Sequence, residues 1–393
     1  MPTENVTYLL GAGISIDAGM PSTATLTDWI LNREDIRRDT DSLYIISPIG
    51  RDEDRSRYER FRHRVFLRTL LAIAMRAAKF TPERPITYED LYYMIYQLSR
   101  HIGGSTENPL LDEVIPRLDE EMRPLYERDD HGMLTGLLTL CDETRTMIHC
   151  IVQHFLSAPP RGIDYLNGLL KVIENGNASH ASIFTLNHDM VLEHYFTERH
   201  ISPWDGFTRE AEGPDEYGQK QLIRIWDPWA QDWGHGYAVR FMKAHGSVDW
   251  FPAQDGWYKT QHNVRGIENI ARMYRGENLA IGTHNKTDYY SRSIFSDIQT
   301  IFRRTLSESR HLVVAGFSFG DVLIGSQIMN WMEVHQEAKT LLIDLHADKI
   351  TQEKVWPEKE NRWESWIRAG RAKVLEKSVK DVSESEVRKF LET

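Results

Sequence analysis

Five short apolar runs, each bounded by glycine or polar residues, recur along this 393-residue chain. They occupy residues 7–10, 182–185, 239–243, 312–315 and 340–345, and residues 278–282 form a weaker sixth run. Continuous apolar runs of this length are typical of strands buried on both faces. Segments with helical periodicity separate several of them. We therefore predict an α/β fold with a Rossmann-like, doubly wound parallel sheet.

A long and mostly helical stretch lies between the first run and the others. Residues 51–79 are dense in arginine, and acids interleaved with these arginines favour a solvated helix face over a patch for a partner. Residues 110–127 look like an acidic connector, and residues 203–236 like irregular structure or a hairpin. We predict one catalytic domain at 1–345, with its sheet core at about 1–27 and 180–345 and a helical insertion at about 28–179.

Residues 346–393 are expected to form a helical C-terminal tail. The tail carries Trp356, Trp363 and Trp366, which either anchor an interface or belong to a helix folded back on the core. The sequence alone leaves both interpretations open.

The composition of the chain argues against several classes of function. A net charge of -11 argues against broad nonspecific binding to nucleic acid. Cys141 and Cys150 are the only cysteines, so a zinc site of four cysteines is impossible and a disulfide framework is not expected. No apolar run approaches the roughly 20 residues that span a bilayer. Without a signal-peptide pattern at the N-terminus, we expect a cytoplasmic protein that does not bind membranes.

The first apolar run leads directly into the sequence GAGISIDAGMP at residues 11–21. A strand, a glycine turn and a helix beginning after Ser15 would together form an anion site. Glycines there let the backbone approach a pyrophosphate closely. Only Gly11 and Gly13 match G-x-G-x-x-G, whose third position falls on Ile16, so the match is weak and an ordinary strand-to-helix turn remains the alternative.

Polar clusters follow three later runs, namely TLNHD at 185–189, KAHGS at 243–247 and GFSFGD at 316–321. Open α/β sheets keep their ligands at the carboxyl ends of strands. An imidazole accepts a proton near neutral pH, which makes His245 a candidate general base. The amide of Asn187 can both donate to and accept from hydroxyls and water. Taken singly, His245 is better explained as a hydrogen-bonded loop histidine, and Asn187 as a helix N-cap. Their positions after strands of the same sheet favour a catalytic role instead.

Other histidines are weaker candidates. A spacing of six residues separates His188, His194 and His200, which does not place them on one helical face, so no metal site is predicted there. Three further histidines lie in irregular segments, where they either line the pocket or, by default, lie on the surface: His235, His262 and His284.

Taken in order, GAGISIDAGMP, TLNHD, KAHGS and GFSFGD resemble the motifs of the sirtuin (SIR2) superfamily of NAD-consuming enzymes. They are most similar to the zinc-less, bacterial SIR2-like NADases, which are often found in anti-phage defence systems. The resemblance covers about the first twenty residues and about residues 180–345. It implies that NAD is bound as the substrate.

The resemblance also implies roles for individual residues. Asn187 would hold the nicotinamide ribose and the attacking water, and His245 would be the general base. Asp189 would support the loop of Asn187, and Asp321 would stabilise its own turn. The residues implied to contact the cofactor, the first four of them around its pyrophosphate, are Gly11, Ala12, Gly13, Ser15, Pro21, Gly316 and Ser318.

The chain departs from sirtuin deacylases in two places. Those enzymes continue the glycine turn with Pro-Asp-Phe-Arg, whereas Pro21 is followed here by Ser22, Thr23 and Ala24. They also carry a four-cysteine zinc module, which the helical insertion would replace. The resemblance therefore implies an NAD+ glycohydrolase that yields nicotinamide and ADP-ribose. A protein deacylase and a non-catalytic sensor of NAD or ADP-ribose remain as alternatives.

The family setting implies partners as well. A free NADase would be toxic, so its activity is expected to depend on assembly or on another protein. We expect a homo-oligomer that works with a HerA-type ATPase or an Argonaute-related protein.

Overall fold

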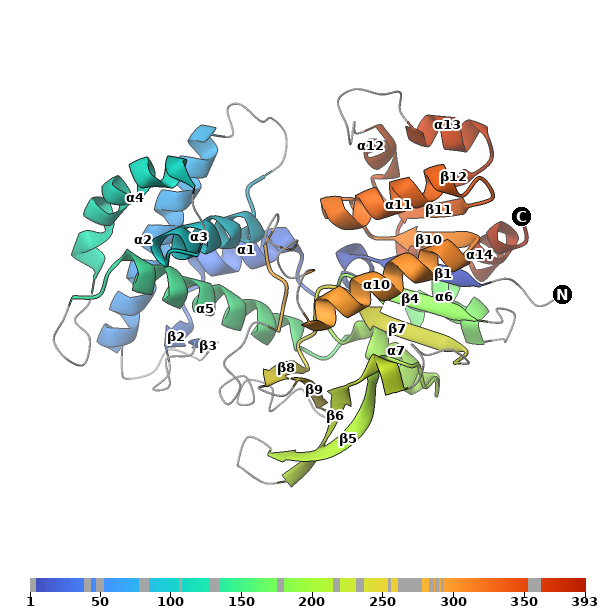
Figure 1. The fold of residues 1–393 in the computed structure, drawn as a ribbon, viewed down its shortest axis with the longest axis horizontal. Helices are drawn as coiled ribbons and strands as arrows, with labels where there is room; N and C mark the ends of the chain where they lie inside the picture. The colour runs from blue at the N-terminus through green and yellow to red at the C-terminus, as the bar shows by residue number, and fades with distance from the viewer. Residues whose placement is uncertain are drawn as a thin grey trace. The chain divides into compact units, whose positions relative to one another are not determined.

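The computed structural model describes most of the chain in two compact units (Figure 1). Unit 1 comprises Met1–Met20, Leu156–Leu279 and Thr287–Thr393, and unit 2 comprises Pro21–Phe155 and Ala280–Lys286. The described residues are 5–38, 44–46, 53–77, 85–105, 108–126, 134–174, 180–214, 220–230, 237–253, 256–260, 278–282, 286, 290, 293–352 and 362–393.

Unit 1 is built on a six-stranded sheet in which every pair of neighbours is parallel. Its spatial order is β12-β11-β10-β1-β4-β7. The strands are β1 (Val6–Leu10), β4 (Ala181–Thr185), β7 (Val239–Lys243), β10 (His311–Ala315), β11 (Lys339–Asp344) and β12 (Ala372–Glu376). Renumbered by chain order, the sheet reads 6-5-4-1-2-3, which is the Rossmann order, and its direction of winding reverses between β1 and β10. The predicted parallel α/β sheet is confirmed.

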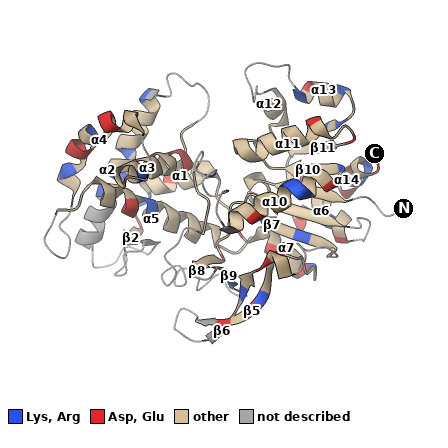
Figure 2. Cartoon of the chain, in the orientation of Figure 1, with Lys and Arg blue, Asp and Glu red and all other residues tan. Residues whose placement is uncertain are grey.

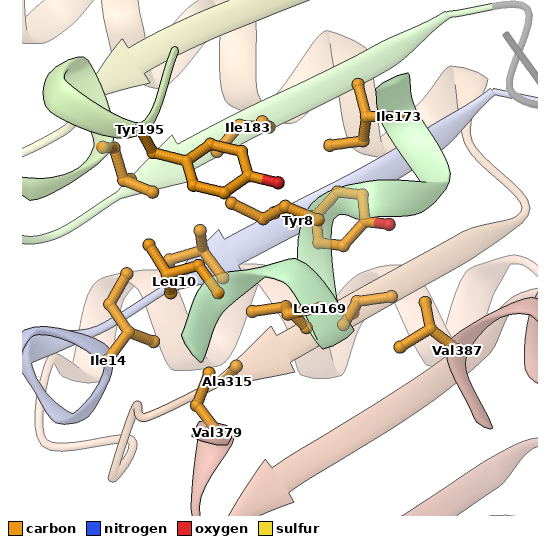
Figure 3. Close-up of a cluster of buried hydrophobic side chains, with 14 of the residues drawn as sticks. Tyr8, Leu10, Ile14, Leu169, Ile173, Ile183, Tyr195, Ala315, Val379 and Val387 are labelled. Atoms are coloured by element: carbon orange, nitrogen blue, oxygen red, sulfur yellow. The ribbon is translucent and has the colours of Figure 1, made fainter. Parts of the chain in front are cut away.

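Both faces of this sheet are covered, as expected for β1, β4, β7 and β10, whose residues are all buried. One face packs against α6 (Asn167–Glu174), α7 (Val191–Glu198) and α14 (Glu384–Leu391). Figure 3 shows Tyr8 and Leu10 of β1 among side chains from these helices. Because side chains alternate along a strand, Phe184 points to the other face, where its ring lies 4.8 Å from Phe302 of α10 (Ser293–Glu308). α11 (Val322–Val334) also packs on the sheet, and its Met332 contacts Thr340 of β11.

A second, antiparallel sheet in unit 1 has the order β5-β6-β9-β8. Its strands are β5 (Phe207–Pro214), β6 (Lys220–Trp226), β8 (Trp250–Ala253) and β9 (Gly256–Thr260). A hairpin therefore occupies much of residues 203–236. Residues 278–282 do not form the weak strand that the sequence suggests, since only Leu279 makes an isolated bridge, to Gly246.

The C-terminal segment is not a helical tail. After α12 (Ala347–Gln352) and α13 (Arg362–Arg368), the chain adds β12 to the edge of the sheet and ends in α14. Trp363 and Trp366 are buried, and the Trp363 ring lies 5.5 Å from Phe319. These two tryptophans therefore pack in the core of unit 1, whereas Trp356 lies outside the described residues.

Unit 2 is mostly helical. It contains α1 (Thr23–Asn32), α2 (Glu53–Ala77), α3 (Tyr88–Ile102), α4 (Pro109–Met122), most of α5 (Leu137–Leu156) and the short ribbon of β2 (Ile36–Arg38) and β3 (Tyr44–Ile46). The expected connector is the helix α4, which Asn108 caps through the N–H of Leu110. Not every arginine of α2 lies on a solvated face, because Arg62 is buried and pairs with Glu143 at 2.5 Å.

None of the helices in the described ranges combines the length and the apolar character that crossing a membrane requires.

Candidate active site at the carboxyl edge of the sheet

The turns that follow β1, β4, β7 and β10 lie at one edge of the sheet, because parallel strands share their carboxyl ends. These turns carry the four sequence clusters. Ligands of Rossmann-like sheets bind outside this edge, where the winding reverses between β1 and β10. The site is therefore built from residues of unit 1.

The turns after β1 and β10 are packed backbone against backbone. Gly11 N–H donates to Ala315 O at 2.9 Å, and Gly13 N–H donates to Gly316 O at 3.0 Å. A Cβ on Gly11 would lie 2.4 Å from Gly316 O, and one on Gly13 would lie 2.7 Å from Gly316 Cα. Gly316 itself has a φ of +62°, which favours glycine. The close approach of two turns thus explains these glycines without any ligand.

The helix expected directly after Ser15 is absent. Ala12–Ser15 form one short 3-10 helix, and Gly19, with a φ of +87°, then turns the chain. The next helix is α1, which begins only at Thr23 and belongs to unit 2, as does Pro21. The prediction of a helix dipole at the glycine turn is therefore wrong. In this turn Ala12 and Gly13 are exposed residues, and the N–H of Gly13 is already donated to Gly316 O.

Asn187 joins the turn after β4 to the glycine turn. Its Nδ2 donates to Gly11 O at 3.0 Å and to Ser15 Oγ at 2.9 Å. Its Oδ1 is buried and has no hydrogen-bond partner among the described residues. An unsatisfied buried acceptor costs about 1–3 kcal/mol, so a ligand hydroxyl or water is the partner this geometry calls for. Asn187 is not a helix N-cap, because Met190 occupies that position before α7.

Asp189 and Lys243 hold the same loop from within the protein. Asp189 Oδ1 accepts from the N–H of Val191 at 3.0 Å, and Lys243 Nζ donates to His188 O, Asp189 O and Glu193 Oε1. Burial raises the pKa of Asp189, while Lys243 and the N–H of Val191 act in the opposite direction. Asp189 thus supports the loop of Asn187 rather than facing a ligand.

His245 is paired with Asp321. Its Nε2 lies 2.9 Å from Asp321 Oδ2, which also accepts from the hydroxyl of Tyr290 at 2.6 Å. Asp321 Oδ1 caps α11 by accepting from the N–H groups of Leu323 and Ile324, both at 3.0 Å. A carboxylate can only accept hydrogen bonds, so Nε2 of His245 must carry the proton that it shares with Asp321 Oδ2. In this tautomer Nδ1 is the basic nitrogen of the imidazole.

This pairing adds two roles that the sequence does not reveal. Asp321 stabilises its own turn, as expected, but it also orients His245, from which it is separated by 76 residues. Tyr290 stacks on the His245 ring at a centroid distance of 6.0 Å and belongs to no recognisable motif. The sequence around Tyr290 shows no periodicity that predicts a role for this residue.

His188 lies between Asn187, which contacts the glycine turn, and His245, which pairs with Asp321. Its ring centroid lies 6.1 Å from that of His245, and the N–H of Val248 donates to His188 O at 3.1 Å. A continuous set of contacts therefore runs from the glycine turn through Asn187 and His188 to His245. Ser318 is exposed in the turn after β10. The described ranges contain no group of three or more histidine, cysteine or acidic residues placed to hold a metal.

Comparison with models of known protein families gives no match to this chain, and comparison with curated proteins gives none either.

Proposed function

We propose that this chain is an NAD+ glycohydrolase that releases nicotinamide and ADP-ribose. The observation that carries the proposal is the contact chain from the glycine turn to His245, at the reversal point of a Rossmann-ordered sheet. Dinucleotides bind across this point in such sheets. The four sequence motifs that resemble SIR2-like NADases supply the choice of reaction.

Two features of the edge fit a dinucleotide. Ala12 and Gly13 are exposed, as is Ser318 in the adjoining turn after β10, which leaves this part of the edge open to a diphosphate. The unpaired Oδ1 of Asn187 suits a ribose hydroxyl or a water molecule. Asn187 is only 6 % exposed, so such a partner would be held away from bulk solvent.

The reaction consumes one water and produces nicotinamide, ADP-ribose and one proton. His245 would accept the proton at Nδ1, and Asp321 would stabilise the imidazolium that forms. Asn187 would orient the hydroxyl or water through Oδ1, which is a positioning effect. Tyr290 and the N-terminal turn of α11 keep Asp321 in place by three hydrogen bonds.

The direct test is release of nicotinamide from NAD+ by the purified full-length chain. His245→Ala and Asn187→Ala are each expected to reduce the rate by about 10²-fold or more, because the first removes the general base and the second removes the group that positions the attacking hydroxyl or water. His335→Ala is the matched control, because His335 follows the opposite end of α11 from Asp321. Unimpaired turnover in either site variant, with the fold intact by circular dichroism, would overturn the proposal.

The same assay separates the rival functions. Nicotinamide release that requires an acylated peptide would identify a deacylase, although two cysteines cannot supply the deacylases' zinc module. Binding of NAD+ or ADP-ribose without turnover, even in the presence of every expected partner, would identify a sensor.

The proposal also includes the role of unit 2, the oligomeric state and the partner protein. The helices of unit 2 would take the place of the zinc module, and a homo-oligomer in the cytoplasm would act with a HerA-type ATPase or an Argonaute-related protein in anti-phage defence by NAD+ depletion. Sizing the protein alone and with the product of a neighbouring gene tests this. A monomer that is fully active by itself would contradict the assembly.

A further inference from the structure

A second site lies in unit 1 between the edge strand β7 and the helix α10. A pocket of about 230 Å³ is lined there by Trp229, Arg240, Thr300, Ile301, Arg304 and Thr305. Figure 2 shows basic residues on both β7 and α10. Arg240 is the second residue of β7, at its amino end, whereas His245 follows the carboxyl end of the same strand. The pocket is therefore separate from the candidate active site.

Arg240 is buried without a full set of partners. Its side chain points to the α10 face of the sheet and the residue is 8 % exposed. Nε donates to Ser182 Oγ at 3.0 Å, but in the described ranges Nη1 and Nη2 make no hydrogen bond or ion pair. Burial of a guanidinium is costly unless the charge is paired. Arg240 lines the pocket, where an anion would pair with its guanidinium.

The charges around Arg240 favour an anion in the pocket. Burial lowers the pKa of Arg240, Glu308 opposes this effect, and the positive charge of Arg304 adds to it. Glu308 is shared between the two arginines, because its Oε1 also accepts from Arg304 Nε at 2.9 Å. The two arginines and one glutamate leave a net positive charge at this pocket.

Two uncharged groups of the pocket narrow the chemistry of the ligand. Trp229 is 67 % exposed, which offers an indole ring for stacking. The hydroxyl of Thr305 is buried and has no hydrogen-bond partner among the described residues. The volume is below the 300 Å³ or so at which pockets for drug-sized ligands begin. A single ring with one anionic group is the size that fits.

We propose that this pocket binds a small aromatic anion, with its carboxylate or phosphate on Arg240 and its ring against Trp229. The Thr305 hydroxyl would donate to the same anionic group, and Arg304 would add its charge from the rim. The proposal is independent of NAD+ hydrolysis.

Titration calorimetry of the full-length chain with benzoate and phenyl phosphate tests the proposal. Benzamide, a neutral analogue of benzoate, is expected to bind about tenfold more weakly or not at all, because the charge-assisted bonds to Arg240 are lost. Arg240→Met should weaken both anions by about tenfold or more, and Arg240→Lys by less. Equal binding of benzamide and benzoate, or no binding of either anion, would overturn it.

Two milder variants keep the test decisive if Arg240→Met fails to fold. Trp229→Ala should weaken phenyl phosphate severalfold while leaving inorganic phosphate unchanged, because only the aromatic ligand stacks. Arg304→Gln, on the half-exposed face of α10, should weaken every anion severalfold. Unchanged affinity for phenyl phosphate in both variants would contradict the assigned pocket.

Discussion

The carboxyl edge of the sheet and the C-terminal segment of residues 371–393 use polar contacts in opposite ways. At the edge, the side chains of Lys243, His245 and Asp321 are at most 5 % exposed. In the C-terminal segment, Lys377 pairs with Glu386 at 2.7 Å, and both side chains remain about 30 % exposed. The two regions belong to the same unit, and they differ in how far their charged side chains are exposed to solvent.

The difference in solvent exposure indicates that the polar groups at the sheet edge and those of the C-terminal segment have different roles. Taking charges out of water is expensive, and a hydrophobic replacement for a buried ion pair is often no less stable. Half-exposed pairs cost little and contribute little. Stability alone therefore does not account for a buried cluster that includes His245 and the unpaired Oδ1 of Asn187.

The largest expected effect comes from Gly316→Ala, which forces apart the two turns at the edge. A Cβ there would lie 2.6 Å from Ile14 N and 2.8 Å from Gly13 Cα, at a φ of +62°. We expect the free energy of unfolding to fall by about 5 kcal/mol or more, as measured by denaturant unfolding. The matched control is Gly320→Ala in the same turn, where the nearest atom would be Ser318 Oγ at 3.6 Å. A stable Gly316→Ala protein would show that the turns are not locked together.

Removal of Lys243 should have the next largest effect. Lys243→Met leaves the carboxylate of Glu193 buried without its cation, which costs about 3–4 kcal/mol. Burial raises the pKa of Glu193 and Lys243 opposes this, so the variant should raise that pKa further. An acid with a raised folded-state pKa favours folding at low pH and loses this contribution as the pH rises. The variant should therefore lose stability, relative to wild type, as the pH rises above the ordinary glutamate pKa.

The C-terminal segment provides the control for Lys243. Lys377→Met removes the cation of a half-exposed pair of the same residue types, so we expect a loss of only about 0.2–1 kcal/mol. Equal losses for the two lysine variants would remove the contrast between the regions.

The sequence predicts the sheet better than it predicts the site. Strands such as β10 are continuous apolar runs buried on both faces, and they are recognisable without neighbours. The half-exposed edge strand β12 contains Lys373 and Glu376, and its pattern does not stand out from a helix. Motifs predict that Asn187 and His245 share an edge, because parallel strands align their ends.

Local sequence patterns do not predict which distant segments of the chain contact each other. The pairing of His245 with Asp321 joins two turns 76 residues apart, and no local periodicity encodes it. Likewise, Gly11 and Gly13 look like a phosphate-binding turn, whereas the contact with Gly316 depends on β10 lying beside β1. Tertiary packing, rather than local preference, determines both features.

Asp321→Asn tests whether the buried pair at the edge serves chemistry. Asparagine can still cap α11 through Oδ1, but its Nδ2 would donate to His245 Nε2 and move the imidazole proton to Nδ1. We expect nicotinamide release to fall by about 10²-fold, equivalent to about 2.7 kcal/mol, with little change in Tm. Asp321→Ala should show the same loss of activity together with a lower Tm, because the helix cap is lost as well. Full activity in Asp321→Asn would assign the pair to structure alone.

Glu386→Gln tests the half-exposed pair of the C-terminal segment from its acidic side. Lys377, and then the backbone and hydroxyl of Ser383, lower the pKa of Glu386 to about 2. Glutamine keeps the capping box with Ser383, so the variant loses only the charge, worth about 0.5–1 kcal/mol at pH 7 for a partly exposed pair. A lowered pKa stabilises the folded state above the ordinary value of 4.5 and stops doing so as the pH falls to about 2. Denaturant unfolding of both proteins should therefore differ between pH 5 and 7 and converge near pH 2, whereas a difference that persists at pH 2 would show that Glu386 acts through packing.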